Sequence, residues 1–207
     1  MIELFLSAFV TFFVVIDPPG CAPIFAGLTA GTDTLHRTAM AIRSTLVAAA
    51  ILIAFALLGE PLLRTLGISL DAFRIAGGIM LFLIALEMVF EKRTQRRENR
   101  ANEVASHPEQ YEDVSIFPMA MPMIAGPGSI ASAMLIMQRN HGLAAHAVVL
   151  GALLANLVIM LGALLAAGPL MRLLGYKVEA VITRLLGVLL AALAAQFVID
   201  GLKASFA

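Results

Sequence analysis

Residues 14–25 read VVIDPPGCAPIF, and the interpretation of the whole chain depends on this stretch. It places an acid, three prolines and a glycine near the middle of an apolar segment that runs approximately from residue 4 to residue 27. Proline lacks an amide donor and clashes with the preceding helical turn at a cost of about 3 kcal/mol, and Pro18 disfavours helical geometry at Asp17. We therefore expect two half-helices, with Asp17 as the N-cap of the second and Pro18 at its first position.

Six apolar segments are long enough to cross a bilayer, which requires about 20 residues per helix. Hydrophobic residues make up 60% of the chain and charged residues 14%, whereas soluble domains average about 45–50% and about 25%. The mean hydropathy is +0.94. We therefore expect an all-α membrane protein with six transmembrane segments, the first of which is retained because no Lys or Arg precedes it. The segments lie approximately at residues 4–27, 39–59, 70–90, 115–137, 144–168 and 180–202.

Charge and composition exclude several classes of function. The formal net charge is zero and most charges lie in short connections, so we expect no nucleic-acid partner. Cys21 is the single cysteine, and the four histidines lack metal-ligand spacing, so we expect no internal disulfide, metal or cofactor. Because no paired carboxylates, HExxH motif or Ser/His/Asp set occurs at membrane depth, we do not expect an enzyme.

The distribution of Lys and Arg predicts the orientation in the membrane. Four of these residues (Arg64, Arg74, Arg139, Lys203) lie on the side of the termini, and ten lie on the opposite side. The positive-inside rule then places both termini outside the cell and residues 91–114 in a cytoplasmic linker. The ten are Arg37, Arg43, Lys92, Arg93, Arg96, Arg97, Arg100, Arg172, Lys177 and Arg184.

An internal repeat relates the two halves of the chain. Matches of Ala with Ala or Leu with Leu do not indicate a repeat, because they occur at almost any offset between apolar helices. Matches of Pro, Gly and Arg occur at two offsets. At an offset of 108 residues, Pro19-Gly20 matches Pro127-Gly128, and Pro61, Arg64 and Gly67 match Pro169, Arg172 and Gly175. At an offset of 110 residues, Arg74 and Gly77 match Arg184 and Gly187. Three spans per repeat make the second copy enter from the opposite side, which predicts an inverted-topology repeat. The predicted parts are residues 1–90, the linker 91–114, and residues 115–207.

The fourth segment contains a second break, PMIAGPGSI at residues 122–130. Freed backbone groups at membrane depth persist only when they are buried in protein or line a wet cavity, so two repeat-related breaks are expected to meet near the midplane. Half-helix N-termini suit a carboxylate, and unwound carbonyls suit an ammonium group or a cation. The alternative is that both are structural kinks or re-entrant loops, with Asp17 only a helix cap. Since Ala125 takes the place of Asp17 in the second break, we hypothesise that the first half carries ion or proton coupling and that the second mainly binds the substrate.

The candidate binding residues come from the two breaks and from the fifth segment. Asn156 either contacts a zwitterionic solute or forms an interhelical hydrogen bond. Ser129 and Ser132 either line the site or bond back to their own helix. Glu87, Gln196 and Asp200 lie close to segment ends, where snorkelling or capping is expected. The predicted binding residues are Asp17, Pro18, Pro19, Gly20, Cys21, Pro23, Gly126, Pro127, Gly128, Ser129 and Asn156.

The chain resembles the MarC family of prokaryotic membrane proteins over nearly its whole length. The Asp-Pro-x-Gly-x-x-Pro break at residues 17–23 and the Gly-Pro-Gly-Ser-Ile break at residues 126–130 carry this resemblance. A characterised archaeal member transports glycine and alanine, so the resemblance implies a transporter of small neutral amino acids, coupled to the proton gradient. The sequence departs from the family pattern at Cys21, where Asn is usual, and at Pro19, where an aliphatic residue is usual.

The leading hypothesis is a secondary transporter in the bacterial cytoplasmic membrane that holds a small zwitterion between the two breaks and works by rocking of the repeats. A channel or a broad-specificity efflux protein is the alternative, followed by a membrane-embedded enzyme and a scaffold protein. Gly151-Ala152 and Gly162-Ala163 permit close helix packing, either within one chain or in a homo-oligomer.

Overall fold

The computed structural model describes residues 1–93, 95–96, 98–99 and 113–206, and within the last range the side chains of residues 170–177 and 179 are not described. The described chain is helical and contains no strand. In chain order the elements are α1 (Ile2–Ile16), α2 (Pro18–Leu28), α3 (Thr34–Thr65), α4 (Leu70–Val89), η1 (Ser115–Ile124), α6 (Pro127–Arg139), α7 (Leu143–Leu165) and α8 (Ala167–Phe206).

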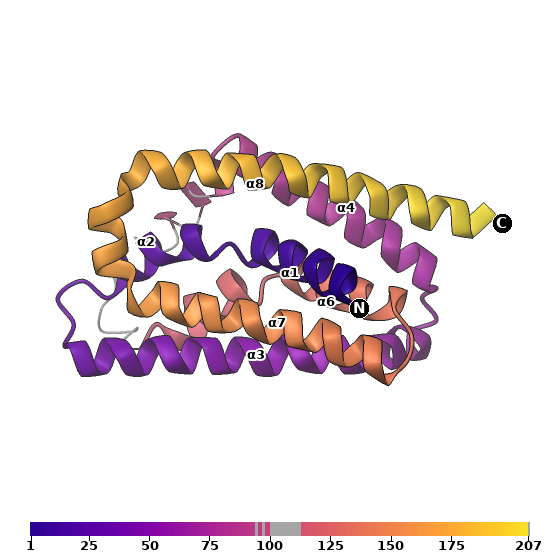
Figure 1. The fold of residues 1–207 in the computed structure, drawn as a ribbon, viewed down its shortest axis with the longest axis horizontal. Helices are drawn as coiled ribbons and strands as arrows, with labels where there is room; N and C mark the ends of the chain where they lie inside the picture. The colour runs from indigo at the N-terminus through magenta and orange to yellow at the C-terminus, as the bar shows by residue number, and fades with distance from the viewer. Residues whose placement is uncertain (94, 97, 100–112, 207) are drawn as a thin grey trace.

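Five helical segments within these residues are long and apolar enough to cross a membrane, and α1 with α2 counts as one of them, Ile2–Leu28. A sixth is obtained if η1 and α6, which are bent by 52° at the break between them, are counted as one span. Both termini lie toward the same end of the bundle, which is consistent with an even number of crossings (Figure 1). The prediction of an all-α, multi-pass membrane protein is confirmed.

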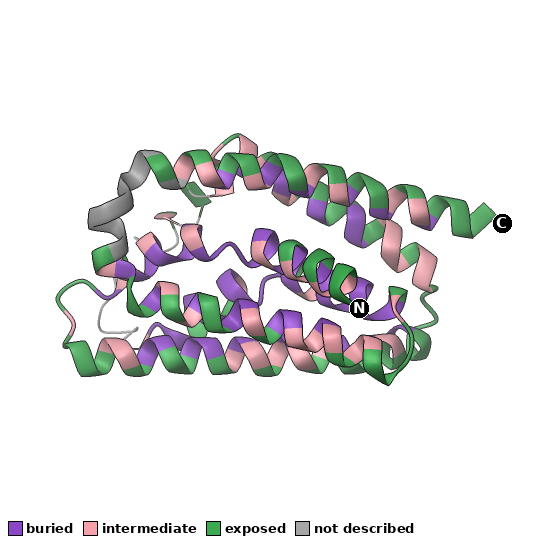
Figure 2. Cartoon of the chain, in the orientation of Figure 1, coloured by how far each residue is buried: buried purple, intermediate pink, exposed green. Residues whose placement is uncertain are grey.

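The helices form three layers. Figure 1 shows α4 beside α8 along one edge and α3 beside α7 along the other, with α1, α2 and α6 between the two pairs. In the most apolar window of Ile2–Leu28, 56% of the residues are buried, whereas the corresponding share in α3 is 28%. The interrupted helices are therefore the central elements of the molecule, and the continuous helices surround them (Figure 2).

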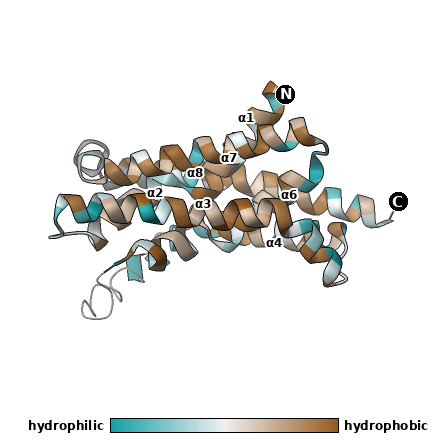
Figure 3. Cartoon of the chain, turned by 90° about the horizontal axis from the view of Figure 1, so that it is seen from below, coloured by the Kyte–Doolittle hydropathy of each residue, from teal (hydrophilic) through white to brown (hydrophobic). Residues whose placement is uncertain are grey.

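The outer faces of the continuous helices are apolar. Hydrophobic residues follow the lengths of these helices, and hydrophilic residues gather at their ends (Figure 3). A soluble protein rarely exposes such a continuous apolar surface, but the hydrocarbon core of a bilayer matches it. Exposed large side chains on these helices include Leu46, Leu57, Leu58, Leu83, Leu154, Val158, Leu185, Val188 and Leu189.

The two halves of the chain pack mainly on each other. Both α1 and α2 contact α7 and α8, while η1 contacts α3, and α6 contacts α3 and α4. The pairs α3 with α7 and α4 with α8 also join different halves. By contrast, α7 touches its own neighbours α6 and α8 at only a few positions. Each half therefore depends on the other for its core.

The most extensive of these contacts, between α4 and α8, rests on glycine. A Cβ atom on Gly78 would lie 2.9 Å from the carbonyl oxygen of Ala194, and one on Gly187 would lie 2.8 Å from Cβ of Met88. The missing side chains let the two backbones approach closely, as small residues do in membrane helix pairs. Since the start of α4 meets the end of α8, the two helices run antiparallel.

Candidate functional site

The chain leaves helical geometry at Asp17, between α1 and α2. Asp17 adopts the left-handed conformation (φ 59°, ψ 65°), which Asp tolerates better than most residues. Its side-chain oxygen Oδ1 accepts a hydrogen bond from the backbone N–H of Gly20 at 3.2 Å, and Pro18 is the first residue of α2. Asp17 therefore caps the second half-helix with its own carboxylate.

The surroundings of this junction are closed. Asp17 is only 1% exposed, and Ile16 and Cys21 on either side are completely buried. A Cβ atom on Gly20 would lie 2.3 Å from Oδ2 of Asp17, so the carboxylate fits closely against the first turn of α2. None of residues 17–23 lines any of the three cavities described below.

The junction between η1 and α6 is longer and less regular. Phe117 and Met121 within η1 have non-helical geometry, and each is joined to the following proline by a cis peptide bond. Gly126 is extended (φ −77°, ψ 170°), and α6 begins at Pro127. The irregular stretch thus starts upstream of the predicted break at residues 122–130. Among the described residues, no side chain caps the N-terminus of α6.

The first turn of α6 lies against the last turn of α1. A Cβ atom on Gly128 would lie 3.4 Å from Cγ1 of Val15 and 2.5 Å from Cδ1 of Ile84 on α4. Val15 is two residues before Asp17. Gly128 is therefore the point at which the second interrupted helix meets the first.

A cavity of about 340 Å³ opens beside the first turn of α6. We call it the linker-side cavity, because Arg93 and Arg96, which follow α4, form part of its wall. Its volume lies at the lower end of the range of about 300–1,000 Å³ for small-molecule pockets. Four of the predicted binding residues line it, Gly126, Pro127, Gly128 and Ser129, together with Ile84, Glu87, Arg93, Arg96, Pro122 and Met123.

The charged wall of this cavity was missed by the sequence reasoning. Arg93 donates a hydrogen bond to the backbone oxygen of Val15 at 2.7 Å, and Arg96 forms an ion pair with Glu87. Glu87, expected to snorkel or cap at a segment end, thus takes part in an ion pair at the cavity. The run of Lys and Arg after the third segment could have indicated these cavity residues, but it was used only to predict orientation. Two guanidinium groups, one carboxylate and the positive end of α6 give the cavity a net cationic wall.

Asn156 lies elsewhere. It is completely buried on α7, and its Nδ2 donates to the backbone oxygens of Phe9 at 3.0 Å and Ala152 at 2.9 Å. Phe9 lies seven residues before the end of α1, which corresponds to about 10 Å along the helix axis. The structure therefore does not bring Asn156 into the linker-side cavity and shows the interhelical hydrogen bond instead.

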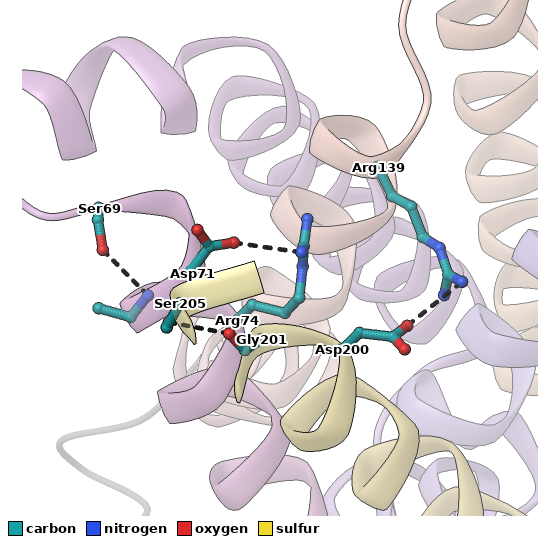
Figure 4. Close-up of polar contacts among 8 residues, drawn as sticks. Ser69, Asp71, Arg74, Arg139, Asp200, Gly201 and Ser205 are labelled. Atoms are coloured by element: carbon teal, nitrogen blue, oxygen red, sulfur yellow. Dashed lines mark hydrogen bonds and ion pairs between the residues drawn. The ribbon is translucent and has the colours of Figure 1, made fainter. Parts of the chain in front are cut away.

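A second cavity, of about 330 Å³, lies at the end of the bundle that carries the termini. We call it the terminus-side cavity. Arg139 is part of its wall and forms an ion pair with Asp200 of α8 at 3.3 Å, as Figure 4 shows. Nearby, Asp71 and Arg74 on α4 form a second ion pair. The terminus-side cavity is lined by Glu3, Leu4, Ser7, Ala8, Thr11, Ile136, Arg139, Asn140, Leu193 and Phe197.

The third cavity, of about 540 Å³, lies between α3 and α6 and is lined by Glu60, Arg64, Gln138 and His146, among others. The side chain of Arg64 is 81% exposed, so this hollow opens on the outside of the bundle. None of the predicted binding residues lines it. Within the described residues, no cluster of three His, Cys, Asp or Glu side chains could hold a metal ion.

Comparisons with known proteins agree with the resemblance inferred from the two breaks. The family model described as MarC family integral membrane protein matches residues 2–206. A UPF0056 membrane protein of Methanocaldococcus jannaschii is 35% identical, over 98% of this chain and 97% of its own length. The UPF0056 membrane protein YhcE of Escherichia coli is 31% identical over 98% and 94%, and YvbG of Bacillus subtilis is 32% identical over 100% and 97%. No solved structure matches the chain.

Proposed function

Because the chain belongs to the MarC family of integral membrane proteins, we propose that it is a secondary transporter of small neutral amino acids such as glycine and alanine. The observation that carries this proposal is the linker-side cavity, which opens where the backbone is uncapped at the break within a candidate membrane span. Non-helical backbone inside a membrane protein is tolerated where it is buried or lines a water-filled cavity, and transporters place their binding sites at such points.

The packing of the helices supports an inverted repeat. An axis in the membrane plane that exchanges the halves would turn contacts of α1 and α2 with α7 and α8 into contacts of η1 and α6 with α3 and α4. The helices make the first set in full, and of the second set η1 contacts α3 and α6 contacts α3 and α4. The antiparallel contact of α4 with α8 also fits, because these are the third helices of the two halves. Rocking of one half against the other would then open the cavities alternately.

The chemistry of the linker-side cavity suits a small zwitterion. The backbone N–H groups of Gly128 and Ser129 lie in the first turn of α6, and they and Arg93 are suited to a carboxylate. Glu87 also lines the cavity, and its carboxylate, which pairs with Arg96, supplies the negative charge for an ammonium group. A volume of about 340 Å³ has room for a small amino acid, and the charged wall suits a zwitterion better than the apolar compounds of a general efflux protein.

We further propose that the proton gradient drives transport through Asp17. An ionisable side chain at membrane depth is costly and commonly belongs to a proton or ion pathway. Protonation of the carboxyl would weaken its hydrogen bond with the N–H of Gly20 and so loosen the start of α2. The proton would thus act on the junction that lies beside the substrate cavity.

The experiment is uptake of labelled glycine and alanine into proteoliposomes, with and without an imposed pH gradient. The parent protein is compared with Asp17→Asn and with the control Asp33→Asn, an exposed acid between α2 and α3. We expect saturable uptake that the gradient accelerates in the parent and the control, but not in Asp17→Asn.

Other outcomes assign other functions. Flux that does not saturate would indicate a channel, and transport of bulky apolar compounds would indicate efflux. If neither amino acid binds or crosses the membrane, the proposed substrate class is wrong. If Asp17→Asn keeps the full response to the gradient, Asp17 is only a helix cap.

The orientation is also part of the proposal. In the sequence, ten of the fourteen Lys and Arg residues fall in or beside the connections on the side opposite the termini, so we place that side in the cytoplasm of a bacterial cell and both termini outside. Reporter fusions to the C-terminus, active only on one side of the membrane, test this placement.

A further inference from the structure

One face of α6 connects the linker-side and terminus-side cavities. Ser129 lines the first, and Ile136 and Asn140 line the second. Ser129 and Ile136 are seven positions apart, so they lie on the same side of the helix, and Asn140 follows its last turn. Ser129 and Ile136 are separated by about 10 Å along the axis. Only about two helical turns of this face lie between the two cavities.

Helix α1 lies against α6 at both ends, and it lines the terminus-side cavity but not the linker-side cavity. Val15 lies beside Gly128 at the linker side, and the first part of α1, up to Thr11, shares the terminus-side cavity with Ile136. Since α1 and α6 contact each other and meet in opposite directions, the section between the cavities is bounded by these two helices. Neither cavity includes the α6 residues in the middle of this section, Ser132 and Ala133.

Ser132 carries an unused polar group in this closed section. The residue is completely buried, and its hydroxyl has no hydrogen-bond partner in the part of the chain that the structure describes. Several other buried hydroxyls among the described residues bond to the carbonyl four residues earlier, as Ser44 does to Met40 at 2.7 Å, whereas the hydroxyl of Ser115, at the start of η1, also lacks a partner there. An unpaired buried hydroxyl costs about 1–3 kcal/mol, and the alternative that Ser132 bonds back to its own helix is not realised.

We propose that the solute crosses the protein between α1 and α6 and that the hydroxyl of Ser132 hydrogen-bonds to it in the closed section. This inference rests on the proposed transport function and adds the path and a specificity-determining residue. The ligand that fits is a small solute with a carboxylate or ammonium group, because such a group satisfies the hydroxyl. Ala133, next to it, is also completely buried, so the section is closed in this structure.

The first test compares Ser132→Ala with the matched control Ser44→Ala, in which a buried hydroxyl away from the path is removed. We expect Ser132→Ala to raise the KM for alanine uptake about fivefold to tenfold, since one hydrogen bond is worth about 1 kcal/mol, and Ser44→Ala to leave KM unchanged. The thermal midpoint of Ser132→Ala should not fall, because the lost hydroxyl had no partner in the protein. An unchanged KM, or a fall in the midpoint without a KM change, would overturn the proposal.

The second test does not depend on the identity of the solute. Cys21, the single cysteine, is replaced by Ala, and Ser129→Cys, Ser132→Cys and Ser44→Cys are then made in that background. In proteoliposomes, a small charged thiol reagent should modify the first two but not the third, and Ser132→Cys should be reached from either side of the membrane. Failure at Ser132 with reaction at Ser129 would refute the path even if amino acids are transported. Reaction at Ser132 without glycine or alanine uptake would support the path and reject only the substrate class.

Discussion

At the junction of α1 and α2 one residue, Asp17, leaves the helix, whereas the junction of η1 and α6 includes non-helical residues at Phe117 and Met121 and an extended Gly126. In the first junction the carboxylate of Asp17 accepts a hydrogen bond from a backbone N–H at the start of the next helix, and the side chains around it are buried. In the second, Ala125 offers no such group, and the start of α6 borders a cavity. The comparison teaches that a side-chain cap accompanies a closed junction, whereas the half-helix without a side-chain cap begins beside a cavity.

The largest expected loss of folding stability comes from adding a side-chain atom at Gly126 in the second junction. In Gly126→Ala the new Cβ would lie 2.5 Å from the backbone oxygen of Pro122, which cannot move aside as a side chain can. We expect a loss of about 3 kcal/mol, the upper part of the range for overpacking, measured by thermal or denaturant unfolding in detergent. Gly151→Ala on α7 is the control, because a Cβ there meets no atom within 4 Å. Equal stability of the two variants would mean that the second junction is not tightly fixed.

The next effect concerns the cap of the first junction. Asp17→Ala removes the hydrogen bond to Gly20 and places Ala at φ 59°, so we expect a loss of about 2 kcal/mol in the same unfolding assay. Asp17→Asn keeps a side-chain acceptor and a residue that tolerates this conformation, and should lose much less. The control Asp33→Ala changes an N-cap acid at φ −58° that makes no capping bond. If it costs as much as Asp17→Ala, the cap is not what stabilises the first junction.

The smallest effect concerns the entry to the second interrupted span. Partial burial raises the pKa of Asp113, but hydrogen bonds from Ser115 and the guanidinium of Arg43 outweigh it, so the pKa lies below its usual value of 3.8. The folded protein thus gains stability from the ionised carboxylate above pH 3.8 and loses it as the pH falls through the lower folded pKa. The Arg43 side chain is 55% exposed, so the gain is at most about 0.5 kcal/mol.

A pH series of unfolding midpoints checks this prediction. The parent should lose its small advantage over Asp113→Asn as the pH is lowered from 5 toward 3. Position 5, which the repeat relates to Asp113, is Phe, so the first interrupted span has no equivalent anchor. A constant difference between parent and variant across this range would contradict the assignment.

Local rules predict the fold class and the position of the first junction. Apolar segment lengths require membrane helices, and an acid followed by two prolines allows one arrangement of cap and first turn. The irregular stretch at Phe117 and Met121 was not foreseen, because prolines 118 and 122 forbid a regular helix without specifying what replaces it.

Contacts between distant residues set the limits of prediction at the site. The hydrogen bond of Arg93 with Val15 joins residues 78 positions apart, and that of Asn156 with Phe9 joins residues 147 apart. No spacing rule indicates such pairs. The Gly-Pro-Gly-Ser motif predicted residues 126–129 as binding residues, but the sequence could not show that Arg93 would line the same cavity.

The packing of each half on the other also affects the nascent chain during its synthesis. A ribosome that has completed α4 still has to synthesise α6, α7 and α8, which takes roughly 6 to 24 s at about 5–20 residues per second. During that interval α1, α2 and α3 lack the helices of the second half that contact them in the folded protein. The nascent chain is therefore most vulnerable to membrane proteases before α7 is made, and a chain that stops after α4 should be degraded rather than accumulate.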